Sequence, residues 1–363
     1  MKITRVVAHQ VSLPLPRPLR TSIHDIRRVE TVVAELRTDE GAVGAGHAFA
    51  FGAHRARALA ALVDDVAPIY EGQDPRAVRA LFERAWKGLN FIGHAGAAVM
   101  ALAAVDTACW DLAAQAAGAP LFRLLGGDRR EVPAYASSGL WLDRSVDELV
   151  EEARGFLDQG HRAVKMRLGR AAAEDLERAR ALREAIGPDV RLMADVNQGW
   201  DEATALRMGR ALEPVGLFWL EEPLPYQDLE GCARVAAALT TPIASGETDY
   251  GSHGMRRHLE LRVADVLMPD LQRMGGVTGL LKAAALCEAF HTPFSPHLFM
   301  EASAHVVAAM PGGLVQEHMD WWQALYTEPL PVVDGHVVLP ERPGLGLTLD
   351  RKALERYGAS GRP

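Results

Sequence analysis

The sequence has few cysteines, no excess of basic residues and no uninterrupted apolar run long enough to cross a membrane. Its three cysteines, Cys109, Cys232 and Cys287, are too few and too scattered for a disulfide framework or a zinc knuckle. The 39 Lys and Arg residues are outnumbered by 47 Asp and Glu residues, and the net charge is −8. This balance argues against a nucleic-acid partner, because phosphate binding relies on clustered Lys and Arg. We expect a protein of the reducing cytoplasm.

The longest apolar stretch, residues 95–114, is interrupted by Asp106 and Asp111. We interpret it as a packed helix and expect no membrane partner. The first residues, MKITRVVAHQVSL, alternate like a β-strand and lack the apolar core of a signal peptide.

The chain changes character along its length, which predicts three segments. Residues 1–125 hold two strand-like runs followed by helical runs, and we expect a separate N-terminal domain there, the one that the resemblance described below implies to be a capping domain. Residues 126–325 alternate short apolar strands with charged amphipathic helices, a pattern typical of a parallel α/β barrel. Residues 326–363 are rich in Pro and Gly and are expected to fold back on the N-terminal domain.

Nearly every predicted barrel strand ends in an ionisable residue. The strand candidates are VPAYAS, AVKMRLG, RLMADVN, LFWLEEP, PIASGE, ADVLMPD, PFSPH and GLVQEH. In an α/β barrel the carboxyl ends of the strands ring one mouth, where catalytic residues gather. Capping of the following helices is the alternative explanation. It is a poor one for six consecutive strands, because Glu is a weak N-cap.

Three of these carboxylates, Asp195, Glu221 and Glu247, follow one another at intervals of 26 residues. Carboxylates that converge from adjacent strands repel one another unless a cation lies among them. A ligand set made only of oxygen favours a hard ion, Mg²⁺ before Mn²⁺. Asn197 could support the metal site or contact a substrate. A surface acidic patch is the alternative.

Asp270 and His297 end neighbouring predicted strands. A carboxylate bonded to one imidazole nitrogen fixes the tautomer and raises the basicity of the other nitrogen, which makes His297 a candidate general base or acid. Glu317, on the next strand, could donate or share a proton with a developing oxyanion. A buried barrel histidine without a catalytic role is the alternative for His297.

These residues resemble the enolase superfamily, and within it the mandelate racemase subgroup. The segments that carry the resemblance span nearly the whole chain: AAVDTACWDLAAQAAGAPLFRLLGG, MADVNQGW, WLEEPLP, SGET, MPDLQRMGGVTG, SPHLF, VQEH and PERPGLGLTLD. The resemblance implies a modified (β/α)₇β TIM-type barrel with an α+β capping domain formed from both termini. It also implies a symmetric homo-oligomer. The related muconate cycloisomerase and dipeptide epimerase type expects a lysine on the sixth strand, where this chain has Asp270, so we set it aside.

The resemblance also implies a reaction that begins with removal of the proton α to a carboxylate, with one Mg²⁺ per subunit stabilising the enediolate. It assigns the metal ligands as Asp195, Glu221 and Glu247. It makes His297 with Asp270 one acid/base, and Glu317 faces the carboxylate of the small-molecule substrate.

The second barrel strand, AVKMRLG, departs from the family pattern. Mandelate racemase relatives usually carry Lys-x-Lys there, and the second lysine is the base opposite the His–Asp pair. This chain keeps Lys165 but has Arg167 in the second position, and a guanidinium stays protonated at physiological pH. Arg167 is expected to bind a carboxylate or hydroxyl, or to form a structural salt bridge. Lys165 is expected to contact the substrate carboxylate, with a base role left open.

A racemisation needs an acid/base on each face of the substrate, whereas a β-elimination needs only His297. We therefore expect a hydro-lyase that dehydrates a sugar acid, an aldonate or aldarate, to a 2-keto-3-deoxy acid. A racemase or epimerase using Lys165 is the alternative, and a non-catalytic metal-binding homologue is a more remote one.

Substrate specificity is expected to come from capping-domain loops at residues 20–28 and 47–57. In these loops Arg20, His24, Phe51 and His54 could reach a ligand, although each could equally be a solvated loop residue.

Overall fold

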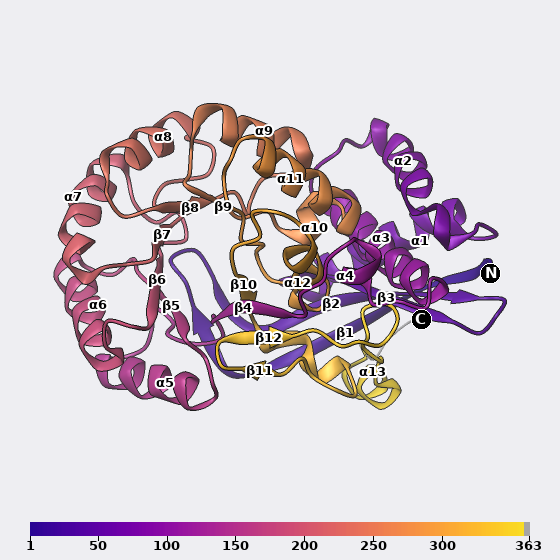
Figure 1. The fold of residues 1–363 in the computed structure, drawn as a ribbon, viewed down its shortest axis with the longest axis horizontal. Helices are drawn as coiled ribbons and strands as arrows, with labels where there is room; N and C mark the ends of the chain where they lie inside the picture. The colour runs from indigo at the N-terminus through magenta and orange to yellow at the C-terminus, as the bar shows by residue number, and fades with distance from the viewer. Residues whose placement is uncertain (359–363) are drawn as a thin grey trace.

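The computed structural model describes residues 1–358, and it combines a capping domain with a barrel (Figure 1). The capping domain begins with an antiparallel sheet of β1 (Ile3–Arg20), β2 (Asp25–Thr38) and β3 (Val43–Ala50), in that order. β1 lies at the edge of the sheet, and an edge strand tolerates prolines such as Pro14 and Pro16.

Four helices follow in the sequence: α1 (Ala53–Tyr70), α2 (Val78–Gly88), α3 (Ala97–Ala116) and α4 (Leu121–Leu124). α3 is long and apolar enough to cross a membrane, but most of its surface is buried inside the protein. It packs directly on β3, because Gly44 and Gly46 have no side chain. A Cβ at Gly46 would lie 2.2 Å from the carbonyl oxygen of Ala104. The predicted packed helix is therefore present.

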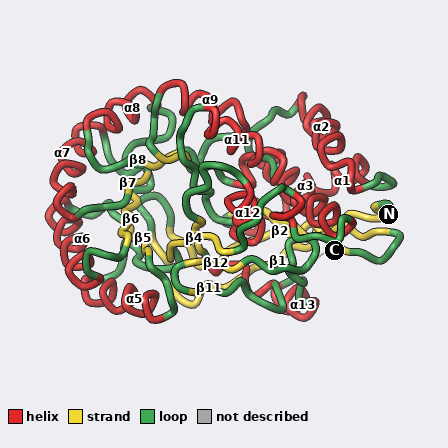
Figure 2. The backbone as a smooth tube through the Cα atoms, viewed as in Figure 1, coloured by secondary structure: helices red, strands yellow, loops and turns green. Residues whose placement is uncertain are grey.

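The barrel is built from parallel strands surrounded by helices (Figure 2). Its strands are β4 (Glu131–Ala136), β5 (Ala163–Arg167), β6 (Arg191–Asp195), β7 (Trp219–Glu221), β8 (Ile243–Ser245), β9 (Val266–Leu267) and β10 (Gln316–His318). Its helices are α5 (Val146–Asp158), α6 (Ala172–Ile186), α7 (Glu202–Leu212), α8 (Leu229–Ala238), α9 (Gly251–Leu261), α10 (Leu271–Met274), α11 (Val277–Ala289) and α12 (Met300–Ala309).

The ring closes through the segment around Phe294 and through β10. Phe294 forms parallel bridges with Leu267 and Gly313, and β10 pairs in parallel with β4. The predicted TIM-type barrel is thereby confirmed. The segment PFSPH forms only isolated bridges rather than the predicted strand, because Pro293 and Pro296 have no N–H to donate to a ladder.

The final segment contacts both parts of the molecule. β11 (Val332–Val333) pairs with β12 (His336–Val338), which pairs antiparallel with β4 at the barrel. α13 (Arg351–Tyr357) packs against β1, and Gly358 bridges Val11. Residues 359–363 of the predicted C-terminal segment lie outside the described residues.

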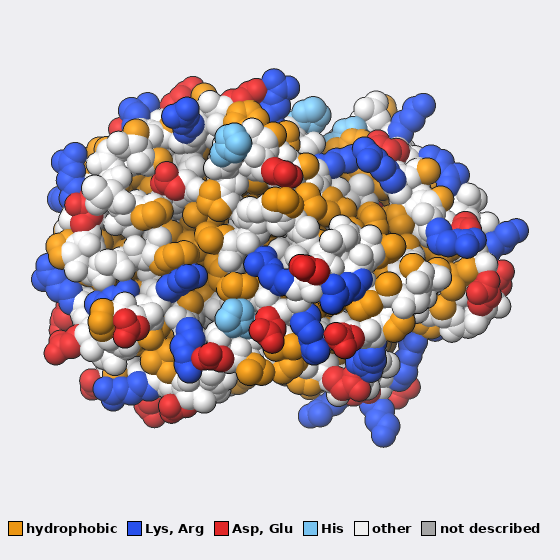
Figure 3. Space-filling view, viewed as in Figure 1, with side chains coloured by type: hydrophobic (Ala, Val, Ile, Leu, Met, Phe, Trp, Pro, Cys, Tyr) orange, Lys and Arg blue, Asp and Glu red, His pale blue; other side chains and the backbone are white. Residues whose placement is uncertain are grey.

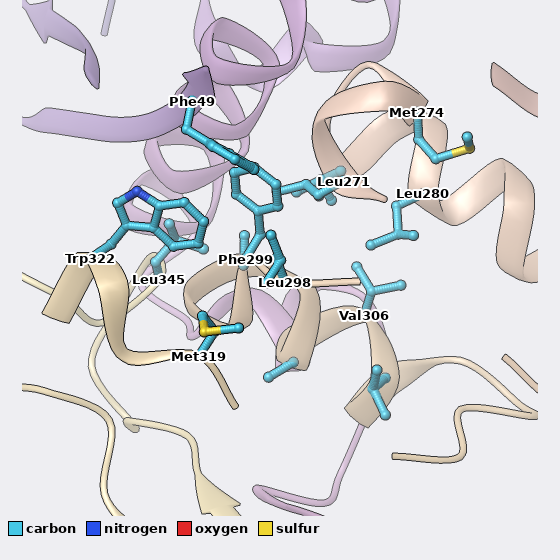
Figure 4. Close-up of a cluster of buried hydrophobic side chains, with 14 of the residues drawn as sticks. Phe49, Leu271, Met274, Leu280, Leu298, Phe299, Val306, Met319, Trp322 and Leu345 are labelled. Carbon is cyan, nitrogen blue, oxygen red and sulfur yellow. The ribbon is translucent and has the colours of Figure 1, made fainter. Parts of the chain in front are cut away.

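An aromatic cluster joins the capping domain to the barrel (Figure 4). Phe49 of β3 has its ring centroid 5.8 Å from that of Phe299 and 5.3 Å from that of Trp322. Trp322 also donates a hydrogen bond from Nε1 to Thr31 of β2. The cluster fixes the capping sheet over the barrel.

On the face shown in Figure 3, acidic and basic side chains are interspersed.

Candidate active site

A cavity of about 100 Å³ lies between the carboxyl ends of the barrel strands and the capping domain. Its floor includes Lys165, Asp195, Glu247, His297 and Glu317. Its outer wall comes from the turn between β1 and β2 and from the residues after β3. The hydroxyl of Ser22 in that turn hydrogen-bonds the carbonyl oxygens of Leu168 and Val196, which ties the turn to the ends of β5 and β6.

His297 and Asp270 form the predicted pair. His297 Nδ1 lies 2.6 Å from Asp270 Oδ2, and the other oxygen of Asp270 accepts a hydrogen bond from the backbone N–H of Arg273. Asp270 therefore caps α10 and orients the imidazole at the same time. Burial acts to lower the pKa of His297, but Glu247 and Asp270 outweigh it and raise the pKa to about 9. His297 Nε2 lies 3.6 Å from Glu247 Oε1.

The three predicted metal ligands end successive strands of the same barrel face. Asp195 pairs in register with Glu221, and Glu247 follows β8. Asp195 and Glu247 line the cavity, whereas the side chain of Glu221 is fully buried beneath it. Burial and the charges of Asp195 and Glu247 raise the pKa of Glu221, against the opposing charge of Lys165. This is the electrostatic pattern of carboxylates that lack sufficient positive charge.

The ammonium group of Lys165 lies among these carboxylates. Its Nζ is 2.7 Å from Glu221 Oε1, 3.0 Å from Glu317 Oε1 and 3.7 Å from Asp195 Oδ2. Burial favours the neutral amine, but Glu221 and Glu317 outweigh it and raise the pKa of Lys165 well above its usual value. Lys165 is therefore a charged group in this structure.

The oxygen-only donor set suits Mg²⁺, but it does not form a finished cage. Within residues 1–358 no group of three or more His, Cys, Asp or Glu side chains is already arranged to hold a metal ion. The reason is visible at Glu221, whose oxygens are held by Lys165 and by the indole N–H of Trp219 at 2.9 Å. Each oxygen of Glu221 keeps a further lone pair with which it could bind a metal ion. The metal role of the three residues stays a prediction.

Arg167 is held on three sides. Its Nη2 donates to Ser137 Oγ at 2.9 Å, its Nε lies 3.5 Å from Asp195 Oδ2, and its guanidinium lies over the ring of Trp141 at 4.3 Å. It thus combines the two alternatives that the sequence left open, a hydroxyl contact and a salt bridge to a strand-end carboxylate.

Glu317 faces the cavity in the ionised form. Ser137 Oγ donates to its Oε1 at 2.6 Å, and the backbone N–H of Leu298 donates to its Oε2. Burial acts to raise the pKa of Glu317, but Lys165, His297 and the Ser137 hydrogen bond outweigh it and lower the pKa. Both oxygens of Glu317 thus accept hydrogen bonds in this structure. That Glu317 donates or shares a proton with a developing oxyanion stays a prediction.

Of the predicted substrate contacts, Asn197, His24 and Phe51 line the cavity, whereas Arg20 and His54 do not. Arg20 lies between Leu19 and Thr21, which both face the cavity, and the alternation of a strand sends its side chain to the other face. His54 lies in the first turn of α1, where it contacts Arg57. Asn197 also donates from Nδ2 to Asp195 Oδ2 at 2.9 Å.

Several cavity residues were not predicted from the sequence. They include Thr21, Phe49, Trp141, Arg273 and Trp321. The spacing of Arg273 from Asp270, about one helical turn, is a sequence signal that could have placed Arg273 near the site. Its Nη1 donates to the backbone oxygen of Glu247 at 2.7 Å. Trp141 comes from a loop and Trp321 from the 3₁₀ helix η4 (Asp320–Leu325), and the positions of both depend on the folded chain.

Comparisons with known proteins match the whole architecture. Residues 3–126 match the model of the mandelate racemase/muconate lactonizing enzyme N-terminal domain, and residues 148–353 match that of the enolase C-terminal domain-like family. The chain is 35% identical to L-talarate/galactarate dehydratase of Salmonella typhimurium, over 93% of this chain and 87% of that one. It is 36% identical to 3,6-anhydro-alpha-L-galactonate cycloisomerase of Streptomyces coelicolor, over 98% and 99%.

Solved structures agree. A mutant of L-talarate/galactarate dehydratase liganded with Mg and L-glucarate superposes with a TM-score of 0.94, at 33% identity, over 99% of this chain and 92% of that one. Because both family models match and the relatives align over nearly the full length, the chain belongs to the mandelate racemase/muconate lactonizing enzyme family of the enolase superfamily.

Proposed function

We propose that the protein is a Mg²⁺-dependent dehydratase of a sugar acid, an aldonate or aldarate, and forms a 2-keto-3-deoxy acid. The observation that carries the proposal is the pairing of His297 with Asp270 at 2.6 Å on the floor of the cavity. On the same floor, Arg167 occupies the position where a racemase would need its second base. One competent acid/base suits an elimination better than a racemisation.

His297 Nε2 takes the proton from the carbon α to the substrate carboxylate, while Asp270 holds Nδ1. The electron pair of the C–H bond forms the double bond of the enol, and the bond from the β-carbon to its hydroxyl oxygen breaks. The imidazolium returns its proton to that hydroxyl, which leaves as water, and the enol becomes the 2-keto acid. Lys165 contributes positive charge beside the carboxylate where negative charge develops.

Asp195, Glu221 and Glu247 would hold the magnesium ion. When bound, the ion supplies Lewis-acid stabilisation of the enediolate. The structure of a relative with Mg and L-glucarate supports both the ion and the substrate class.

An epimerase is the second candidate, because Lys165 lines the same cavity as His297. To act as the second base, Lys165 would have to lose its proton while paired with Glu221 and Glu317, which both favour the charged form. This environment supports the dehydratase instead.

The test is a screen of aldonates and aldarates with Mg²⁺, with detection of the 2-keto-3-deoxy product. We expect turnover of at least one acid that stops on chelation with EDTA and returns with added Mg²⁺. Turnover that survives chelation, or the absence of a keto product from every acid, would contradict the proposal.

A further inference from the structure

A second, more open hollow lies beside the cavity at the turn between β1 and β2. His24, Ile26 and Phe51 line both spaces. The outer hollow is also lined by Arg27, Arg28 and Arg55, together with the acidic Asp25 and Glu30. His24 thus stands at the end of the cavity far from the strand ends, with its ring beside that of Phe51 at 5.5 Å.

Two arginines act on His24 from different elements. Arg273, in α10, lines the inner cavity, and Arg55, on α1, lines the outer hollow. After burial, the charges of Arg273 and Arg55 are the causes that lower the pKa of His24. The imidazole is therefore neutral, with one N–H to donate.

Both arginines keep donors that are free to reach a ligand. Arg273 uses Nη1 for the backbone oxygen of Glu247, and Arg55 uses Nη1 for the backbone oxygen of Phe51. Arg28, by contrast, donates hydrogen bonds from Nε to the hydroxyl of Ser12 and from Nη2 to the backbone oxygen of Ser12. In the described part of the chain, the Nε and Nη2 atoms of Arg273 and Arg55 have no hydrogen-bond acceptor. Free guanidinium donors beside a neutral imidazole suit an anion.

We propose that this end of the cavity binds a second carboxylate, so that the substrate is a sugar diacid rather than a monoacid. Arg55 and His24 are then specificity-determining residues. The orientation of the substrate in the cavity rests on the proposed function, which places the first carboxylate of the substrate at the strand ends. A monoacid presents a neutral hydroxymethyl group here and leaves the guanidinium of Arg55 without an anionic partner, which disfavours it.

The test compares each six-carbon aldarate with the aldonate of the same configuration. For the configuration that is turned over, we expect kcat/KM for the diacid to exceed that for the monoacid by about tenfold or more, as for a hydrogen bond to a charged group. Arg55→Leu should lower kcat/KM about tenfold for the diacid, so that the preference for the diacid over the monoacid shrinks. Arg57→Leu, an exposed arginine two residues further along α1, is the matched control. Equal rates for the two acids, or equal losses in Arg55→Leu, would overturn the proposal.

A binding measurement separates this proposal from the proposed function. The His297→Asn variant with Mg²⁺ should be stabilised against heat more by the diacid than by the monoacid, and Arg55→Leu should remove that difference. If no acid is dehydrated but this preference is present, the proposed function fails and the diacid site stands. No thermal shift with any diacid, or the same shift with both acids, overturns the diacid site.

Discussion

The side chains of Lys165 and Arg167 project from the same face of β5, yet their surroundings give them different roles. Lys165 is surrounded by Glu221, Glu317 and Asp195, whereas Arg167 contacts the Ser137 hydroxyl and the Trp141 ring. Neither environment favours a neutral nitrogen. At the residue scale, the proton-transfer role falls to His297, whose pKa is also raised, to about 9, but which is oriented by Asp270 and loses its proton far more readily than Lys165 or Arg167.

Replacement of His297 by Asn tests that role. Asn can still hydrogen-bond Asp270 but cannot take a proton, so kcat should fall by about a thousandfold. Mg²⁺ binding, measured by calorimetry, should persist. His318→Asn is the matched control, because that ring lies beside His161 and is not part of the cavity lining. Full activity in His297→Asn would transfer the base role to Lys165.

The sequence predicted which residues reach the cavity floor better than it predicted their partners. Asp195, Glu247, His297 and Glu317 reach the floor because strand ends in a barrel share one mouth. The contact of Lys165 with Glu221 spans 56 residues of sequence and depends on side-chain packing that no local pattern encodes.

At the scale of elements, β3 explains why the sequence predicts a loop over residues 47–57 although residues 47–50 form the end of a strand. The run VGAGHAFA carries two glycines, which weaken a strand signal. The glycines are required because the backbone of α3 lies against β3. A Cβ at Gly44 would be 2.3 Å from the carbonyl oxygen of Ala108. Residues 47–50 consequently belong to the capping sheet, and only residues 51–52 separate β3 from α1.

Gly46→Ala should therefore push α3 away from β3 and lower the free energy of unfolding by about 2 kcal/mol or more. Gly155→Ala is the control, since a Cβ there meets nothing within 4 Å inside α5. It should stabilise the protein by about 0.5–1 kcal/mol through helix propensity. Urea unfolding measures both. A neutral Gly46→Ala would contradict the described contact between strand and helix.

At the scale of the whole molecule, Glu35 joins the two ends of the chain. Its fully buried carboxylate accepts hydrogen bonds from His9 of β1, from Arg37 and from Arg351 of α13. Burial acts to raise the pKa of Glu35, but these three partners outweigh it and lower the pKa well below its usual value. The ion pair between Arg351 and Glu35 thus holds the C-terminal segment against the capping domain, as predicted for that segment.

A carboxylate whose pKa is lower in the folded state stabilises the protein above the unfolded pKa, near 4.5, and loses that contribution as the pH falls. Glu35→Gln should cost about 3 kcal/mol at pH 7, and less as the pH is lowered below about 4.5. Glu30→Gln, on the same strand, should cost little. Urea titrations at pH 7 and pH 3 measure the difference. A loss independent of pH would show that packing rather than charge matters at Glu35.

The most direct test of a single proton-transfer base is turnover of the sugar acid in D₂O with Mg²⁺, followed by mass spectrometry and NMR of product and recovered substrate. The account predicts conversion to the 2-keto-3-deoxy acid, with recovered substrate that keeps its configuration at the α-carbon. Recovery of the α-epimer labelled with deuterium, without loss of water, would show a working base on the opposite face and contradict the account.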